Sequence, residues 1–166
     1  MNPIMAGTVT IREAQDTDRK EILDIFNHYA TTGFAAYPDG PVPPQVFHLL
    51  STGALSFCVM EYETRIIGFG MLKSFFPFPA FRHTGLITYF IHPVYTGQGL
   101  GRQMLSRLTE DARTAGITTL LANISSKNVG SIRFHEQNGF IHAGQLHAVG
   151  EKFGELFDIV WMEKKI

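Results

Sequence analysis

The chain has 166 residues, a length that suits a single hydrophobic core, so we expect one domain over residues 1–166. Hydrophobic residues make up 45% of the sequence and charged residues 17%, which excludes a mainly disordered chain. The formal net charge of −1 provides no basic surface of the kind that binds nucleic acid, so we expect no nucleic-acid partner.

The start of the chain and its apolar runs bear on location. Residues 1–10 lack the charged start and the long apolar run of a secretory signal. No apolar run approaches the ~18 residues that a membrane span needs, so we expect a cytoplasmic protein without membrane contact. The single cysteine, Cys58, cannot form an internal disulfide, and its apolar neighbours predict that it is buried.

The first half of the chain alternates apolar and polar residues with the periods of strands and helices. In chain order the predicted elements are a strand at residues 8–12, a helix that begins after Asp16 or Thr17 and ends at Gly33, a helix at 44–51, strands at 55–62 and 65–74 that form a hairpin, and a strand at 84–92.

The second half continues with an amphipathic helix at 102–115, a buried strand at 117–124, a helix that Asn128 caps and that ends at Gln137, and strands at 140–148 and 156–162. The order β-α-α-β-β-β-α-β-α-β-β combines antiparallel meanders with one β-α-β crossover. It predicts an α/β (α+β) fold in which about four helices flank a mixed, mostly antiparallel sheet of about seven strands.

Three glycines at alternate positions, Gly97, Gly99 and Gly101, follow the strand that Pro93 ends and precede an amphipathic helix. Such a junction directs several backbone N–H groups at the point where the helix dipole is positive, which predicts a phosphate or pyrophosphate site. A P-loop would need a following Lys-Ser or Lys-Thr, and a dinucleotide site would need the spacing G-x-G-x-x-G. The remaining alternative is a flexible turn that binds nothing.

The segment 96–101 resembles the Q/R-x-x-G-x-G/A motif of the GCN5-related N-acetyltransferase (GNAT) superfamily, with Thr96 in the first position. A second segment, 128–140, resembles the N-x-x-S-x-x-x-[YH]-x-x-x-G-F element of the same family. The resemblance implies the GNAT fold, acetyl-CoA as co-substrate, a small-molecule amine as partner and no metal. It implies cofactor contacts at Phe90, Ile91, Gly97, Gln98, Gly99, Leu100, Gly101, Arg102, Asn128 and Ser131.

Two further segments, 25–30 and 149–154 with Asp158, resemble the phosphinothricin and amino-acid N-acetyltransferase branch. That branch acetylates the amino group of small amino acids or their toxic analogues, and its members are typically homodimers. The resemblance therefore implies an amino-acid-like acceptor and a homodimer, and an exposed Phe157 or Trp161 in a late strand would suit such an interface.

The sequence departs from this branch in two further places. Leu86 occupies the position of the glutamate proposed as general base, and leucine cannot accept a proton. The element K-F-G-R-W-x-D has lost its arginine and tryptophan between Lys152 and Asp158. A second hypothesis is therefore a sensor module that binds acyl-CoA with little or no turnover.

His135 is the candidate acid for the departing thiolate, because it holds the position of a tyrosine in many relatives and an imidazole can donate a proton near neutral pH. The alternative is a helix histidine that only packs. With Leu86 in place of the glutamate, the base has to come from His83, Tyr89, His92 or bulk water.

The aromatic loop at residues 75–81 predicts a wall of the acceptor pocket. We expect Phe34, Phe76, Arg82 and His83 to contact the acceptor, with Arg82 able to pair with a carboxylate. The alternative is that this loop only covers the edge of the sheet.

Overall fold

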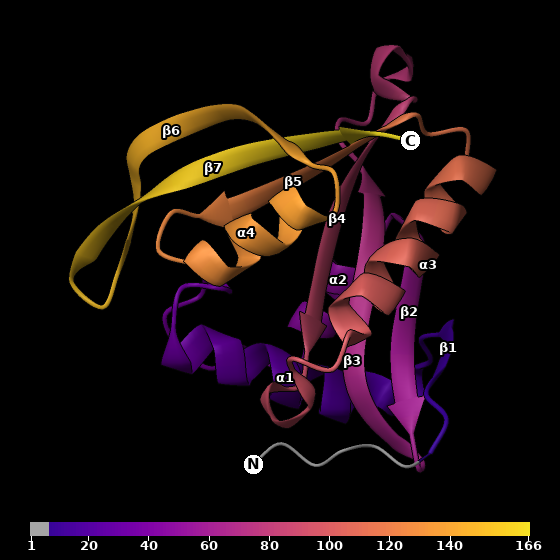
Figure 1. Cartoon of the computed structure of the whole chain (residues 1–166). Coiled ribbons are helices and arrows are strands. Elements are labelled where there is room, and N and C mark those ends of the chain that lie inside the picture. Colours follow the sequence, from indigo (N-terminus) through magenta and orange to yellow (C-terminus); the bar gives the residue numbers. More distant parts are fainter. Residues whose placement is uncertain (1–6) are drawn as a thin grey trace.

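The computed structural model describes residues 7–166, and it contains one sheet in the strand order β1-β2-β3-β4-β5-β7-β6 (Figure 1). The prediction for residues 1–10 therefore falls largely outside the described part of the chain. The strands are β1 (Thr10–Glu13), β2 (Ala54–Tyr62), β3 (Arg65–Ser74), β4 (Thr84–Ile91), β5 (Thr119–Ser125), β6 (Ile141–Lys152) and β7 (Glu155–Lys165). The helices are α1 (Arg19–Thr32), α2 (Val46–Ser51), α3 (Leu100–Thr114) and α4 (Val129–Gln137).

Seven strands and four helices in the described residues confirm the predicted fold class. The sheet is buried from both faces, because α3 packs on one side of β2–β4 and α1 and α2 pack on the other (Figure 1). Gly70 allows α3 to approach closely, since a Cβ there would lie 2.8 Å from the Met104 sulfur. Cys58 is fully buried in this core, as predicted.

The sheet opens in its middle. β4 and β5 pair in parallel only where Thr84–Leu86 meets Thr119–Leu121. Beyond that point β4 stays paired with β3 as far as Ile91, whereas β5 follows β7 in antiparallel register through Ser125. The two strands therefore diverge, and their edges face each other across a gap.

The C-terminal hairpin is longer than predicted, because residues 149–152 and Glu155, expected in a connection, belong to strands. The pairing continues past a register shift in β6, where Asp158 accepts hydrogen bonds from the Ala148 N–H at 2.7 Å and the Gln145 amide at 2.6 Å. Figure 1 shows this hairpin extending away from the rest of the sheet, with β6 as the edge strand.

The start of α1 also differs from the prediction. Residues 16–18 form a 3-10 turn, and Asp18 rather than Asp16 or Thr17 precedes the helix. The Asp18 carboxylate accepts two hydrogen bonds from Arg12, at 2.8 and 2.9 Å, and one from the Gln15 N–H at 2.8 Å. The aspartate thus joins β1 to the helix start.

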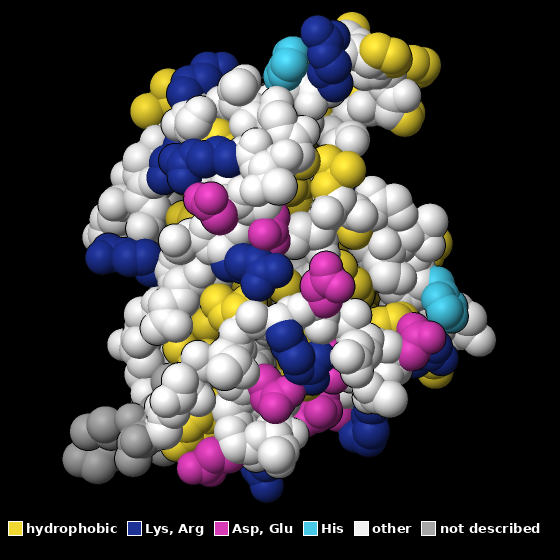
Figure 2. Space-filling model, turned by 90° about the vertical axis from the view of Figure 1, so that its right-hand side faces the viewer, with side chains coloured by type: hydrophobic (Ala, Val, Ile, Leu, Met, Phe, Trp, Pro, Cys, Tyr) yellow, Lys and Arg dark blue, Asp and Glu magenta, His cyan; other side chains and the backbone are white. Residues whose placement is uncertain are grey.

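Two surface features bear on partners. Within residues 7–166 no helix is both long and apolar enough to cross a membrane. The face drawn in Figure 2 carries basic and acidic side chains side by side, without a large area of one sign.

Candidate active site

A cavity of about 1110 Å³ fills the gap between β4 and β5. Residues 87–91 of β4 form one wall and residues 122–125 of β5 form the other. One end reaches the glycine loop and α4, and the other reaches α1 and residues 35–38. Because α4 and α1 contribute lining residues from the two faces of the sheet, the cavity crosses the sheet.

The glycine loop forms an open cradle at one end of this cavity. Gly97 and Gly99 have φ values of 76° and 80°, and a Cβ on either would meet nothing within 4 Å. Gly99 precedes α3, whose first turn has no acidic residue and whose first N–H groups lack helical acceptors. The Gln98 side-chain nitrogen is buried without a hydrogen-bond partner among the described residues, and Gln98 does not line the cavity. The glycines and the first N–H groups of α3 fit a pyrophosphate.

The open edge of β4 presents backbone groups to the cavity. The His92 N–H donates to the Ile67 oxygen at 2.8 Å, so alternate residues of β4 pair with β3 and the residues between them, Tyr89 and Ile91, face the gap. The Tyr29 hydroxyl donates to the Ile91 oxygen at 2.5 Å from the gap side. Phe90 contributes its ring instead, which packs edge-on against Phe26.

The first turn of α4 lines the cavity through Asn128 and Ser131. The Asn128 side-chain oxygen accepts a hydrogen bond from the Ser131 N–H at 3.3 Å, so Asn128 caps the helix. The same residue also lines the cavity. Arg102, on the first turn of α3, lines the same end and is the only lysine or arginine among the described lining residues.

His135 lines the cavity and is only 5% exposed. Its Nδ1 lies 2.7 Å from the Ser131 carbonyl oxygen, and its Nε2 lies 2.9 Å from the Tyr89 hydroxyl. A carbonyl only accepts, so Nδ1 carries the proton of the neutral ring and Nε2 accepts from Tyr89. Burial lowers the pKa of His135 and raises that of Tyr89, which keeps both groups neutral at pH 7.

The end near α1 is closed by contacts that the sequence did not reveal. The Tyr37 hydroxyl donates to the Asn123 side-chain oxygen at 2.7 Å, which joins the α1–α2 connection to β5. Burial raises the pKa of Tyr37 to about 12, and its ring stacks on Phe157 at 6.0 Å. Lys152 is 2% exposed, and its ammonium donates to the carbonyl oxygens of Gly33 and, at 2.7 Å, Ala36.

The structure does not bring the predicted acceptor residues to this cavity. Phe76, Arg82 and His83 precede β4 at the end where it pairs with β5, about 23 Å along the strand from Ile91. Arg82 donates to the Pro79 oxygen at 3.1 Å, and the His83 ring lies 3.1 Å from the Gly116 oxygen. Phe34 packs on Phe153 and Phe157 behind the lining residues.

Leu86 lies where β4 and β5 are still paired and is not a lining residue. Among the described residues that line the cavity there is no aspartate or glutamate. Nor does the described part of the chain hold a cluster of three histidine, cysteine or acidic side chains able to bind a metal. The side chain that titrates nearest to neutral pH in this cavity is therefore that of His135.

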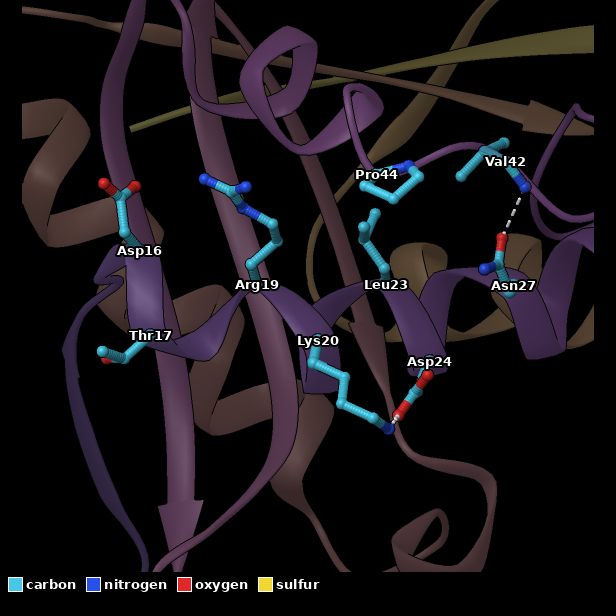
Figure 3. A pocket seen from close by; sticks show the side chains of 9 residues that line it. All are labelled: Asp16, Thr17, Arg19, Lys20, Leu23, Asp24, Asn27, Val42 and Pro44. Atoms are coloured by element: carbon cyan, nitrogen blue, oxygen red, sulfur yellow. Dashed lines mark hydrogen bonds and ion pairs between the residues drawn. The ribbon is translucent and has the colours of Figure 1, made fainter.

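A second hollow of about 620 Å³ lies on α1, away from the gap (Figure 3). Two of its polar side chains pair with each other, and a third binds a backbone N–H. Lys20 pairs with Asp24 at 2.6 Å, and the Asn27 side-chain oxygen accepts from the Val42 N–H at 2.8 Å. The Arg19 guanidinium lies 5.3 Å from the centre of the Phe47 ring. This hollow has neither the glycine cradle nor a free strand edge, so the cavity between β4 and β5 is the candidate site.

Comparison with known proteins gives an independent result. The profile of the acetyltransferase (GNAT) family matches residues 20–140. The chain is 31% identical to the L-amino acid N-acyltransferase MnaT of Escherichia coli (strain K12), over 95% of this chain and 94% of that protein. It is 33% identical to the L-methionine sulfoximine/L-methionine sulfone acetyltransferase of Salmonella typhimurium, over 95% of both chains. An acetyltransferase from Salmonella typhimurium, solved with its cofactor acetyl-CoA, has a TM-score of 0.83 and 32% identity, covering 96% of this chain and 94% of that one.

Proposed function

Since the chain belongs to the acetyltransferase (GNAT) family and is an acetyl-CoA-dependent N-acetyltransferase, we propose that it acetylates the primary amine of a small amino acid or amino-acid analogue. The observation that carries the proposal is the cavity that crosses the sheet. Its cradle end suits a pyrophosphate, and its α1 end is closed by small and aromatic side chains. A thioester bound at the first end would meet an amine held at the second.

We assign the contacts to acetyl-CoA in two groups. The pyrophosphate would accept hydrogen bonds from the backbone of Gly97, Gln98, Gly99, Leu100 and Gly101, with Arg102 adding positive charge. The pantetheine arm and the acetyl group would lie along β4 against Phe90, Ile91, Asn128 and Ser131. The Ile91 N–H faces the gap and would polarise the thioester carbonyl, because a donor fixed in a site with little water stabilises the charge that develops on that oxygen.

The α1 end of the cavity favours a small acceptor. Ala35 and Ala36 line it together with the rings of Phe26 and Tyr37, and Asn123 provides a side-chain amide. The relatives at about 30% identity act on L-amino acids, methionine sulfoximine or phosphinothricin according to their names. An acceptor of that size, with polar groups next to its amine, suits these walls.

The test is an acceptor screen that follows thiol release from acetyl-CoA. L-methionine sulfoximine, phosphinothricin and L-methionine are compared with 3-(methylthio)propylamine, which is methionine without its carboxylate. We expect turnover with the amino acids and at least tenfold lower kcat/KM with the amine that lacks the carboxylate. Equal kcat/KM for L-methionine and this amine would contradict an amino-acid acceptor. The sensor hypothesis requires tight acetyl-CoA binding without turnover of any amine, and the named relatives are acetyltransferases.

We further propose that residues 1–166 act as one cytoplasmic domain and that two copies form a homodimer through the edge strand β6. The described strands all belong to one sheet, which supports a single domain. Large apolar side chains are exposed along β6, with Ile141 at 63%, Leu146 at 50% and Val149 at 55%. An exposed apolar edge of this length invites pairing. Phe157 does not take part, because it is buried within the chain.

A further inference from the structure

The cavity poses a problem for the reaction of the proposed function. A neutral amine that attacks a thioester loses one proton, and the departing sulfur gains one. No carboxylate lines the described cavity, and Leu86 lies outside it. His83 is exposed and lies just before the point where β4 and β5 pair. His92 accepts a hydrogen bond from the Val94 N–H and does not line the cavity. The proton carrier has to be sought among the groups that remain.

The lining tyrosines differ in what their hydroxyls do. Tyr29 donates to the Ile91 oxygen, and Tyr37 donates to the Asn123 oxygen, so neither reaches a group that can take up a proton. Tyr95 contacts the His92 ring through its own ring, with the two centroids 5.7 Å apart. Of the four described tyrosines that line the cavity, Tyr89 has its hydroxyl against an imidazole, 2.9 Å from His135 Nε2. Both residues line the cavity, and Tyr89 is partly exposed whereas His135 is 5% exposed, so the tyrosine is the more accessible member of the pair.

We infer that Tyr89 and His135 form a proton shuttle that carries one proton from the attacking amine nitrogen to the sulfur of coenzyme A. As the N–C bond forms, Tyr89 Oη takes the proton of the amine nitrogen and passes its own proton to His135 Nε2. As the C–S bond breaks, Tyr89 gives its proton to the sulfur and regains the proton from Nε2. The sum is amine plus thioester giving amide plus thiol, and both side chains return to their starting state.

The surroundings of His135 suit this role. Its Nδ1–H is held by the Ser131 carbonyl, so Nε2 is the nitrogen that can gain a proton. The Ser131 hydroxyl lies 3.3 Å from Nδ1, and the rings of Phe134 and Phe140 pack against the imidazole. Lys164 of β7 lies 5.9 Å from the centre of the Phe140 ring. The adjacent Glu136 is paired with His142 instead. Burial lowers the pKa of His135, so it is neutral and able to accept at pH 7.

Tyr89 is in this scheme the catalytic residue, and His135 acts through it as a positioning residue and proton store. The test measures single-turnover thiol release, with enzyme in excess of acetyl-CoA, for Tyr89→Phe, His135→Gln and the double variant. Glutamine keeps an acceptor for the tyrosine but cannot hold the proton. We expect each single variant to be about 100-fold slower, with acetyl-CoA affinity within twofold of wild type. The double variant should be no slower than the slower single variant, because the two residues act as one unit.

The matched control is Tyr62→Phe, which removes a hydroxyl from a partly buried tyrosine that packs on the same core outside the cavity and should leave the rate unchanged. A single variant within threefold of wild type would overturn the shuttle, as would a double variant whose loss is the product of the two. If Tyr89→Phe fails to fold, the rate of His135→Gln alone tests the shuttle, with the same threefold limit.

The pH profile separates this role from a structural one. The wild-type rate should fall at acid pH with a pKa below 6.5, and His135→Gln should lose that limb. The inference rests on the proposed function only for the choice of acceptor. The assay uses the amine that the wild type acetylates fastest. If that amine is not an amino acid, the proposed acceptor class is rejected, but the rates of the Tyr89 and His135 variants still test the shuttle.

Discussion

Lys152 offers the sharpest test of how the fold supports the α1 end of the cavity. Its side chain is 2% exposed, and its ammonium reaches the carbonyl oxygens of Gly33 and Ala36 just beyond α1. Ala36 and its neighbour Tyr37 line the cavity. The lysine therefore joins the end of β6 to the segment that forms the acceptor wall.

The substitution Lys152→Met keeps the length and the apolar stem and removes the donors. Two buried carbonyl groups then lose their partner, at a cost of about 1.5 kcal/mol each. The free energy of unfolding should fall by about 3 kcal/mol, which lowers the Tm of a chain of this size by roughly 6–12 °C. The KM for the amine should rise more than the KM for acetyl-CoA, because the loosened segment belongs to the acceptor end.

The assay is denaturant unfolding at several pH values, followed by steady-state kinetics. Burial lowers the pKa of Lys152 below its ordinary 10.5, so the unfolded chain binds this proton more tightly than the native chain. Wild-type stability should therefore rise with pH between the lowered pKa and 10.5, relative to Lys152→Met. Lys165→Met is the control, since Lys165 is exposed and makes a single bond to the Thr119 hydroxyl, and it should change stability by less than ~0.5 kcal/mol. A loss below 1 kcal/mol in Lys152→Met would refute the reasoning.

Two further predictions concern the cradle and the edge strand. Gly99→Ala and Gly53→Ala both place a Cβ at positive φ and should each cost about 1 kcal/mol of stability, but calorimetry should show at least tenfold weaker acetyl-CoA binding only for Gly99→Ala. Equal affinities of the two variants for acetyl-CoA would contradict a pyrophosphate site in the glycine loop. In sedimentation experiments the wild type should form a dimer, Leu146→Glu should yield monomers, and Leu49→Glu, on the exposed side of α2, should remain dimeric. A monomeric wild type, or a Leu146→Glu dimer of unchanged stability, would contradict pairing through β6.

The sequence predicted most elements because apolar spacing follows burial. On α3 the apolar residues that recur at helical spacing are all buried, namely Leu100, Met104, Leu105, Leu108 and Ala112. The extra length of the last hairpin was missed, because the pairing beyond Leu146 depends on bonds from Asp158 to residues ten or more positions away. Such hydrogen bonds form between residues that are distant in the sequence, so the local alternation of apolar and polar residues does not predict them.

The predicted acceptor residues lie away from the cavity for a related reason. Arg82 and His83 adjoin β4 in sequence, which says nothing about the end at which the sheet opens. That end is fixed by β5, which leaves β4 after Leu121 to pair with β7. Residues from the start of the chain, Tyr29, Ala36 and Tyr37, consequently line the open end, and the lysine that holds them comes from residue 152.

The treatment of acid and base shows most clearly what geometry adds. From the sequence, Tyr89 was one of several candidates for the base and His135 was a separate candidate for the acid. Tyr89 lies on β4 with its side chain packed on the same side of the sheet as α3, and α4 brings His135 against it from 46 positions further along the chain. A hydrogen bond between the two makes acid and base parts of one unit that gives back the proton it receives. Leucine at position 86 is then compatible with turnover, because the net reaction moves a single proton from nitrogen to sulfur and one relay suffices for both steps.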